Sequence, residues 1–166
     1  FAKKAEALKV GDPLNDSTAM GAQVSSDQYE KILSFIESGK SSGAKLTAGG
    51  RGLKDELGGY FVRPTLFTET PKDASIFREE IFGPVLSATN FETTEDLIEC
   101  ANNTSYGLSA GVWTKDISKA LDMTRRLRVG TVWVNCYNVF DAAVPFGGYK
   151  QSGFGRELGK QALELY

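Results

Sequence analysis

The chain has 166 residues, of which 41% are hydrophobic and 11% aromatic, and this composition supports a globular domain with a buried core. Its 19 basic and 21 acidic side chains are mixed along the sequence and give a formal net charge of -2, so no basic stripe is available to bind nucleic-acid phosphates. The sequence contains no histidine, which excludes Ser-His-Asp and Cys-His catalysis and histidine-ligated zinc. We therefore expect neither a nucleic-acid partner nor a metal site.

The apolar segments and the cysteines indicate the compartment. No apolar run approaches the roughly 18–20 residues needed to span a bilayer, and no charged-then-apolar leader opens the chain. Two cysteines, Cys100 and Cys136, are too few for a disulfide framework in a chain of this size. We expect a cytoplasmic protein without a membrane partner.

The N-terminal part of the chain predicts two helices. A helical run over residues 1–9 ends in a turn-forming sequence, rich in Gly, Pro, Asn and Asp, at residues 11–16. A second helix is predicted to begin at Asp27 and to end near residues 39–43. Its buried face has the i, i+3, i+4, i+7 spacing, with Tyr29, Ile32, Leu33 and Ile36 at these positions.

Two strands are predicted next, at residues 46–50 and 60–67, around a glycine-rich turn region. Pro64 lies inside the second of them. Because proline has no N–H to donate to a neighbouring strand, we expect this strand to be irregular or to lie at the edge of its sheet.

The C-terminal part of the chain alternates between strands and helices. Strands are predicted at residues 85–91, 108–114 and 131–135, and helices at residues 94–101, 117–127 and 156–166. Strands that alternate with helices favour a parallel sheet covered by helices on both faces. The continuous apolar run over residues 132–134 is typical of a strand buried on both faces. With no internal repeat or linker, we expect a single domain with an open, largely parallel α/β fold.

Three segments of the chain carry motifs. They are Glu-Glu-Ile-Phe-Gly-Pro-Val at residues 79–85, Thr-Val-Trp-Val-Asn-Cys-Tyr-Asn at residues 131–138, and Pro-Phe-Gly-Gly-Tyr-Lys-Gln-Ser-Gly-Phe-Gly-Arg-Glu at residues 145–157. In this order and at compatible spacing they resemble the C-terminal signature segments of NAD(P)-dependent aldehyde dehydrogenases. The resemblance runs along essentially the whole chain, yet it covers only the C-terminal third or so of a typical member of that family.

This resemblance implies that residues 1–166 are the C-terminal portion of an aldehyde dehydrogenase catalytic domain, with the fold of that domain but incomplete. The nucleotide-binding domain and the segment with the catalytic cysteine are then expected upstream. The helix-like run at the start of the chain is what a cut inside a larger protein would leave.

Glu80 and Phe82 are the candidate cofactor-binding residues. They are two apart in a segment that we expect to be extended, so their side chains are predicted to point to the same side. The resemblance implies that Glu80 accepts hydrogen bonds from the hydroxyls of the nicotinamide ribose and that Phe82 packs near the nicotinamide ring of NAD or NADP. The alternative is a solvated acid and a core phenylalanine. Glu79 is expected on the opposite side, which argues against a Glu79–Glu80 catalytic pair.

Cys136 invites comparison with the cysteine that attacks the aldehyde in this family. Its surroundings, Trp-Val-Asn-Cys-Tyr-Asn, instead match the later pocket-wall segment, and no histidine or cationic cluster in the local sequence lowers its thiol pKa. We interpret Cys136 as a wall or core residue and expect no catalytic residue in this chain. The weaker alternative is that Cys136 is a thiol catalyst in its own right.

The loop over residues 135–146 follows a predicted parallel strand, and ligands of open α/β sheets bind beyond the carboxyl ends of the strands. By resemblance, Asn138, Phe140 and Phe146 line the aldehyde entry tunnel. The alternative is a small satellite core around the two phenylalanines. Asp141 is an acid that would favour a cationic substrate at the tunnel mouth, or is simply solvated.

The resulting hypothesis is a fragment of an enzyme that oxidises an aldehyde to a carboxylic acid with NAD or NADP, inactive on its own. The resemblance also implies a homo-oligomer for the full-length enzyme. The alternative is a non-catalytic structural or interaction protein on the same fold. The aldehyde and the choice between NAD and NADP stay open, because the residues that decide them are expected upstream.

Overall fold

The computed structural model describes residues 1–165. The chain forms two compact units, residues Phe1–Asn90 and Phe91–Tyr166, which we call unit 1 and unit 2. The sequence predicted a single domain, whereas the contacts gather in two units. The assignment of residues 1–166 to part of one catalytic domain stays a prediction.

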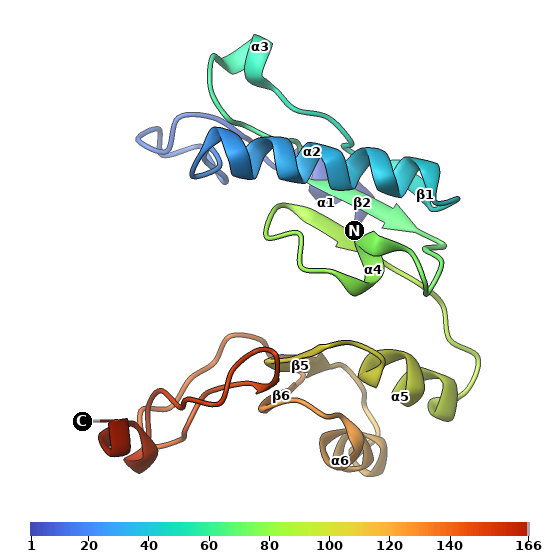
Figure 1. The fold of residues 1–166 in the computed structure, drawn as a ribbon, viewed down its shortest axis with the longest axis vertical. Helices are drawn as coiled ribbons and strands as arrows, with labels where there is room; N and C mark the ends of the chain where they lie inside the picture. Colours follow the sequence, from blue (N-terminus) through green and yellow to red (C-terminus); the bar gives the residue numbers. More distant parts are fainter. Residues whose placement is uncertain (166) are drawn as a thin grey trace. The chain divides into compact units, whose positions relative to one another are not determined.

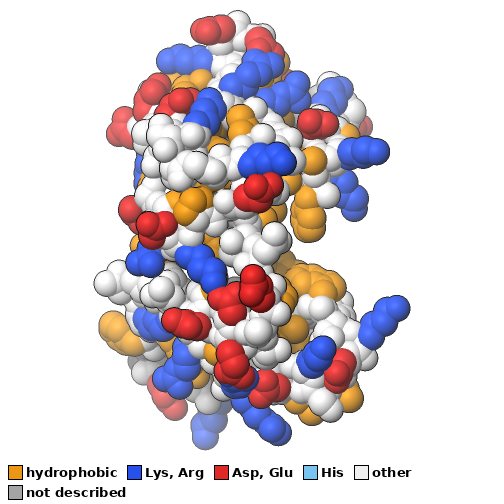
Figure 2. Space-filling view, turned by 90° about the vertical axis from the view of Figure 1, so that its right-hand side faces the viewer, with side chains coloured by type: hydrophobic (Ala, Val, Ile, Leu, Met, Phe, Trp, Pro, Cys, Tyr) orange, Lys and Arg blue, Asp and Glu red, His pale blue; other side chains and the backbone are white. Residues whose placement is uncertain are grey.

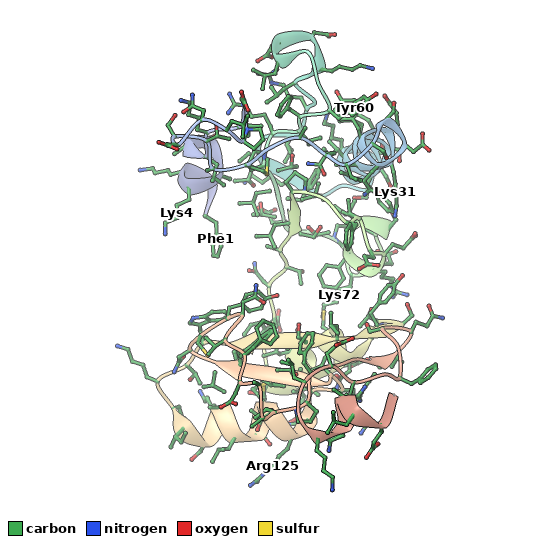
Figure 3. All side chains as sticks on the ribbon, turned by 90° about the vertical axis from the view of Figure 1, so that its left-hand side faces the viewer. Phe1, Lys4, Lys31, Tyr60, Lys72 and Arg125 are labelled. Carbon is green, nitrogen blue, oxygen red and sulfur yellow. The ribbon has the colours of Figure 1, made fainter. Side chains whose placement is uncertain are left out.

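Unit 1 is built on a three-stranded sheet of order β1-β2-β3. Strands β1 and β2 are antiparallel, and β2 and β3 are parallel. Helices α1 and α2 lie on opposite faces of this sheet (Figures 1 and 3). The elements are α1 (Ala2–Ala7), α2 (Ser26–Ser41), β1 (Lys45–Ala48), α3 (Lys54–Leu57), β2 (Thr65–Thr68), α4 (Ser75–Arg78) and β3 (Val85–Ser87).

Helix α2 contributes its apolar face to the core of unit 1. It begins one residue before the predicted start, because the Ser25 hydroxyl accepts a hydrogen bond from the backbone N–H of Gln28 at 3.2 Å and caps the helix. The predicted apolar face is confirmed, since Tyr29, Ile32 and Ile36 are buried and Leu33 packs against their cluster. Burial of this stripe fixes α2 against the sheet.

Pro64 does not place β2 at an edge, so that alternative was wrong, whereas the pairing of β2 with β1 is irregular, with a register shift between Leu46 and Ala48. Strand β2 is the central strand of its sheet. The strand begins at Thr65, one residue after Pro64, and the backbone N–H of Thr65 donates to the Pro84 carbonyl oxygen at 2.8 Å. Pro64 thus lies just outside the ladder, where its missing N–H costs no hydrogen bond.

Unit 2 contains a parallel pair of strands, β5 and β6, joined through helix α6 (Figure 1). This confirms the strand, helix and strand predicted for this region. A second pair, β4 and β7, is antiparallel. The elements are α5 (Thr94–Asn102), β4 (Tyr106–Gly107), β5 (Ser109–Val112), α6 (Ile117–Arg126), β6 (Thr131–Val134), β7 (Tyr149–Lys150) and the 3₁₀ helix η1 (Lys160–Leu165).

Two details of unit 2 differ from the predictions. In β6 only Trp133 is buried, while Val132 and Val134 are half-buried. The last helix is a 3₁₀ helix that begins at Lys160 rather than at Arg156, because Leu158 and Gly159 have φ values of 60° and 59°, which no right-handed helix contains. Tyr166 lies outside the described residues.

The surface of the described chain mixes both charges. Figure 2 shows Lys and Arg side chains interspersed with Asp and Glu over the face in view. None of the helices described for residues 1–165 is long and apolar enough to cross a membrane.

An ion-pair network links the two helices of unit 2. The Arg126 guanidinium donates from Nη1 to Glu95 Oε1 of α5 at 3.0 Å and to Asp122 Oδ2 of α6 at 3.2 Å. The hydrogen bond from Arg126, followed by its positive charge, lowers the pKa of the Glu95 carboxyl below its usual value. Since the folded state binds the Glu95 proton less tightly than the unfolded state does, this pair stabilises the fold above the unfolded pKa and loses its effect as the pH falls through the folded pKa.

We therefore expect Glu95→Gln to reduce the loss of stability that acid causes. Thermal unfolding midpoints measured between about pH 3 and pH 7 should converge for the variant and the wild type at the acid end and separate near neutrality, with the variant less stable there. Glu99→Gln is the control, because Glu99 is exposed on the same helix and forms none of the ion pairs found among the described residues. A constant difference between Glu95→Gln and wild type at every pH would contradict the linkage.

Candidate functional site

The segment Glu80-Ile81-Phe82 between α4 and β3 presents two exposed side chains around a buried one. Ile81 is 6% exposed and belongs to the core of unit 1, whereas Phe82 is 76% exposed and Glu80 is also exposed. The segment is not extended throughout, because Phe82 has a φ of 58° in the left-handed region. The period-two argument for a shared side was therefore wrong, although both candidate side chains do reach solvent.

Helix α2 holds this segment by its backbone. Gln28 Nε2 donates to the carbonyl oxygens of Ile81 at 3.0 Å and Phe82 at 2.9 Å. Lys31 Nζ, on the same face of α2 (labelled in Figure 3), donates to the Glu80 carbonyl oxygen at 3.3 Å. Three consecutive carbonyls are thus bound by two side chains, which we call the α2 clamp, Gln28 and Lys31.

The backbone after the clamp also lies close to α2. A Cβ placed on Gly83 would lie 2.4 Å from Ile32 Cδ1, a distance that a real side chain does not tolerate. Glycine at this position lets the chain pass against the helix. Sequence reasoning missed the clamp, because the i, i+3 spacing of Gln28 and Lys31 indicates a shared face but not what the face contacts.

The exposed side chains of the segment are free to bind a ligand. Among the described residues, the Glu80 carboxylate has no hydrogen-bond or ion-pair partner. A carboxylate offers acceptor oxygens for a diol, and an exposed aromatic ring offers a face to a planar ring. The cofactor-binding role expected for these two side chains stays a prediction.

The second candidate region, the loop after β6, is organised by Trp133. The indole of Trp133 is 7% exposed, and its Nε1 donates to the Val139 carbonyl oxygen at 2.8 Å. The rings of Phe140 and Phe146 meet edge to face, with their centroids 4.9 Å apart. Their centroids lie 5.5 Å and 6.3 Å, respectively, from the centroid of the Trp133 ring. The two phenylalanines predicted from the sequence are thus brought together, on a tryptophan that the site prediction did not include.

Asn138 lies in the same loop, exposed and with a φ of 59°. Its side chain makes no hydrogen bond to other described residues. Asp141 Oδ1 accepts the backbone N–H of Ala143 at 2.8 Å, so this acid stabilises a turn of the loop. Phe140 is 49% exposed, so the aromatic cluster has an open side.

The two cysteines of the described residues are not joined in a disulfide. Cys136 and Cys100 are both free thiols and partly buried. Among residues 1–165 there is no group of His, Cys, Asp and Glu side chains arranged to hold a metal ion.

Comparison with known proteins identifies the family of this chain. The model of the aldehyde dehydrogenase family matches residues 1–166. The chain belongs to the aldehyde dehydrogenase family. The resemblance found in the sequence motifs is thereby confirmed.

Relatives at high identity agree with this assignment. A putative aldehyde dehydrogenase, DhaS, of Bacillus subtilis is 52% identical over 166 residues, which are 100% of this chain and 33% of the relative. A mitochondrial benzaldehyde dehydrogenase of Antirrhinum majus is 51% identical over 167 residues, covering 98% of this chain and 30% of the relative. The chain therefore spans about a third of the length of the curated aldehyde dehydrogenases that it matches.

Solved structures of aldehyde dehydrogenases confirm the α/β fold class. The NAD+ complex of the aldehyde dehydrogenase from Bacillus cereus matches with a TM-score of 0.95 and 50% identity, over 99% of this chain and 33% of that one. A betaine aldehyde dehydrogenase from Staphylococcus aureus, also in complex with NAD+, matches with a TM-score of 0.94 and 41% identity, over 99% of this chain and 33% of its own.

The α2 clamp gives a prediction that needs no ligand. Gln28→Ala removes two hydrogen bonds, each worth about 0.5–1.5 kcal/mol, so we expect the amides of residues 80–85 to exchange with deuterium roughly tenfold faster. Hydrogen–deuterium exchange with peptide mapping measures this. Glu30→Ala, an exposed change on the same helix, should leave the exchange unaltered. Equal exchange in Gln28→Ala and wild type would mean that the clamp does not hold the segment.

Proposed function

We propose that this chain is the C-terminal part of the catalytic domain of an NAD(P)-dependent aldehyde dehydrogenase, an enzyme that oxidises an aldehyde to a carboxylic acid. Family membership supports this proposal. The role of this chain is inferred from two exposed side chains, Glu80 and Phe82, whose backbone is bound by the α2 clamp. NAD or NADP, when bound, accepts the hydride that leaves the substrate.

Glu80 and Phe82 are proposed to position the nicotinamide riboside. The Glu80 carboxylate accepts hydrogen bonds from the ribose hydroxyls, and the Phe82 ring packs beside the nicotinamide. A ligand contact of this kind is effective only if the protein groups are already in place before binding. The clamp provides this, since it fixes the backbone on both sides of the buried Ile81.

Asn138, Phe140 and Phe146 are proposed to line the entry path of the aldehyde. The edge-to-face pair of phenylalanine rings gives an apolar wall, which suits an apolar or aromatic aldehyde. Trp133 holds the wall in place through its contacts with both rings and its hydrogen bond to the Val139 carbonyl oxygen.

The remaining parts of the proposal concern the longer protein. We propose that it is a cytoplasmic homo-oligomer and that its catalytic cysteine and nucleotide-binding domain lie outside the residues of this chain. This chain spans about a third of the length of its relatives, which supports placing the catalytic cysteine and the nucleotide-binding domain in the rest of the longer protein. Both NAD and NADP stay possible, although the structural relatives named above are NAD+ complexes.

The test of the cofactor role is Glu80→Gln in the natural, full-length enzyme. Loss of the charge on the acceptor weakens hydrogen bonds worth about 1.5–3 kcal/mol, so we expect the KM for NAD(P) to rise by roughly tenfold or more, with the KM for the aldehyde little changed. Steady-state kinetics with each substrate varied in turn gives both constants. Glu79→Gln is the matched control and should keep the wild-type values. An unchanged cofactor KM in Glu80→Gln would refute the assignment.

The 166 residues alone should show no dehydrogenase activity. The sequence has no histidine and places no cationic cluster next to Cys136 that would activate its thiol, so we expect no aldehyde-dependent NADH or NADPH formation, measured by absorbance. Activity that disappears in Cys136→Ser would make Cys136 the nucleophile. A natural product that ends with these residues and stays inactive would favour the non-catalytic interpretation.

A further inference from the structure

Unit 2 contains a cavity that neither candidate region uses. Its volume is about 430 Å³, within the range of roughly 300–1,000 Å³ found for small-molecule sites. The cavity opens at the carboxyl end of β5 and lies between α5 and α6. Every lining residue belongs to unit 2, and none belongs to the loop of Asn138, Phe140 and Phe146.

Two aromatic side chains form the apolar walls of this cavity. Phe91 is 55% exposed and Trp113 is 63% exposed, although both are residues that proteins usually bury. Leu97 and Met123 contribute further apolar surface from the two helices. Such walls favour a flat apolar ligand.

The position of the Trp113 ring depends on a glycine. A Cβ placed on Gly111 would lie 2.6 Å from Cζ3 of Trp113, so any other residue there would displace the indole. The indole also stacks on Tyr137, with ring centres 6.5 Å apart and planes inclined by 30°. The exposed wall of the cavity is therefore held in place before any ligand arrives.

The polar side of the cavity carries charges of both signs. Asp122, which lines the cavity, is paired at 3.2 Å with Arg126, which also binds Glu95, whereas the Lys119 ammonium has no ion-pair partner among the residues that the structure describes. The backbone N–H groups of Ser118 and Lys119 donate to the Asp116 carboxylate and are not available to a ligand. An anion would therefore be bound by the Lys119 ammonium, and Ser118 also lines the cavity.

We propose that this cavity is a binding site for a small aromatic carboxylate. The aromatic part lies between Phe91 and Trp113, and the carboxylate meets the ammonium of Lys119. The inference uses none of the residues assigned above to NAD(P) or to the aldehyde, so it stands independently of the proposed function.

A photoaffinity probe tests the proposal in the natural, full-length protein. The probe is 4-benzoylbenzoate, an aromatic carboxylate that inserts into nearby C–H bonds under near-ultraviolet light. Peptide mapping by mass spectrometry should find the adduct within residues 91–123, and excess benzoate should suppress it. Lys119→Gln should lower the labelling roughly two- to fivefold, the effect expected for one largely exposed charged contact.

Two comparisons separate the site from unspecific labelling. Lys115→Gln removes a neighbouring exposed charge that does not line the cavity, and it should leave the labelling unchanged. The uncharged probe 4-benzoylbenzamide should label residues 91–123 weakly. Absence of an adduct in these residues, labelling that benzoate does not suppress, or equal labelling in Lys119→Gln would each overturn the proposal. Adducts confined to the loop over residues 135–146 would do so as well, since they would place the carboxylate in the proposed aldehyde path.

Discussion

The candidate cofactor site depends on the binding of three consecutive carbonyl oxygens by helix α2. A residue other than glycine in the left-handed region costs roughly 1–3 kcal/mol, and Phe82 has this conformation. The two hydrogen bonds from Gln28 contribute about as much, at about 0.5–1.5 kcal/mol each. The clamp therefore offsets the strain that turns the Phe82 side chain outward. Without the clamp, burial of Ile81 alone would fix the position of the segment but not the direction of its exposed side chains.

The buried face of α2 and the parallel strand pair of unit 2 could be predicted from the sequence because their signals are local. The spacing of Tyr29, Ile32 and Ile36 predicted the buried face of α2, and the alternation of elements predicted the parallel pair β5 and β6. The candidate residues Phe140 and Phe146 were also found from sequence, through motifs, and the structure brings their rings together.

The errors concern backbone conformation and strand pairing, which the sequence patterns do not encode. The position of Pro64 relative to β2 depends on which residue begins the ladder, and the late start of η1 depends on the backbone angles of Leu158 and Gly159. The conformation of Phe82 is imposed by Gln28, which lies 54 residues away in the sequence. Period-two reasoning assumes a regular strand, so it fails where a distant side chain selects another conformation.

The ring cluster around Trp133 accommodates both alternatives that the sequence left open. Its contacts are those of a small core, yet Phe140 keeps an exposed fraction of 49%. A loop that must present apolar rings to a substrate needs an anchor of its own, because exposed rings gain little from burial. Trp133 is this anchor, so a satellite core around it is compatible with the proposed tunnel wall.

The left-handed backbone at Phe82 also limits how this position can change during evolution. Valine and isoleucine are the residues least tolerant of a positive φ, while asparagine and glycine adopt it with little strain. A change to a branched aliphatic residue would therefore disturb the backbone of the whole segment, even though the side chain itself is exposed. Substitutions that keep the conformation are restricted to side chains that are unbranched at Cβ, to aromatic side chains, and to asparagine and glycine. The residues accepted at this position should therefore depend more on whether they tolerate a positive φ than on their hydrophobicity.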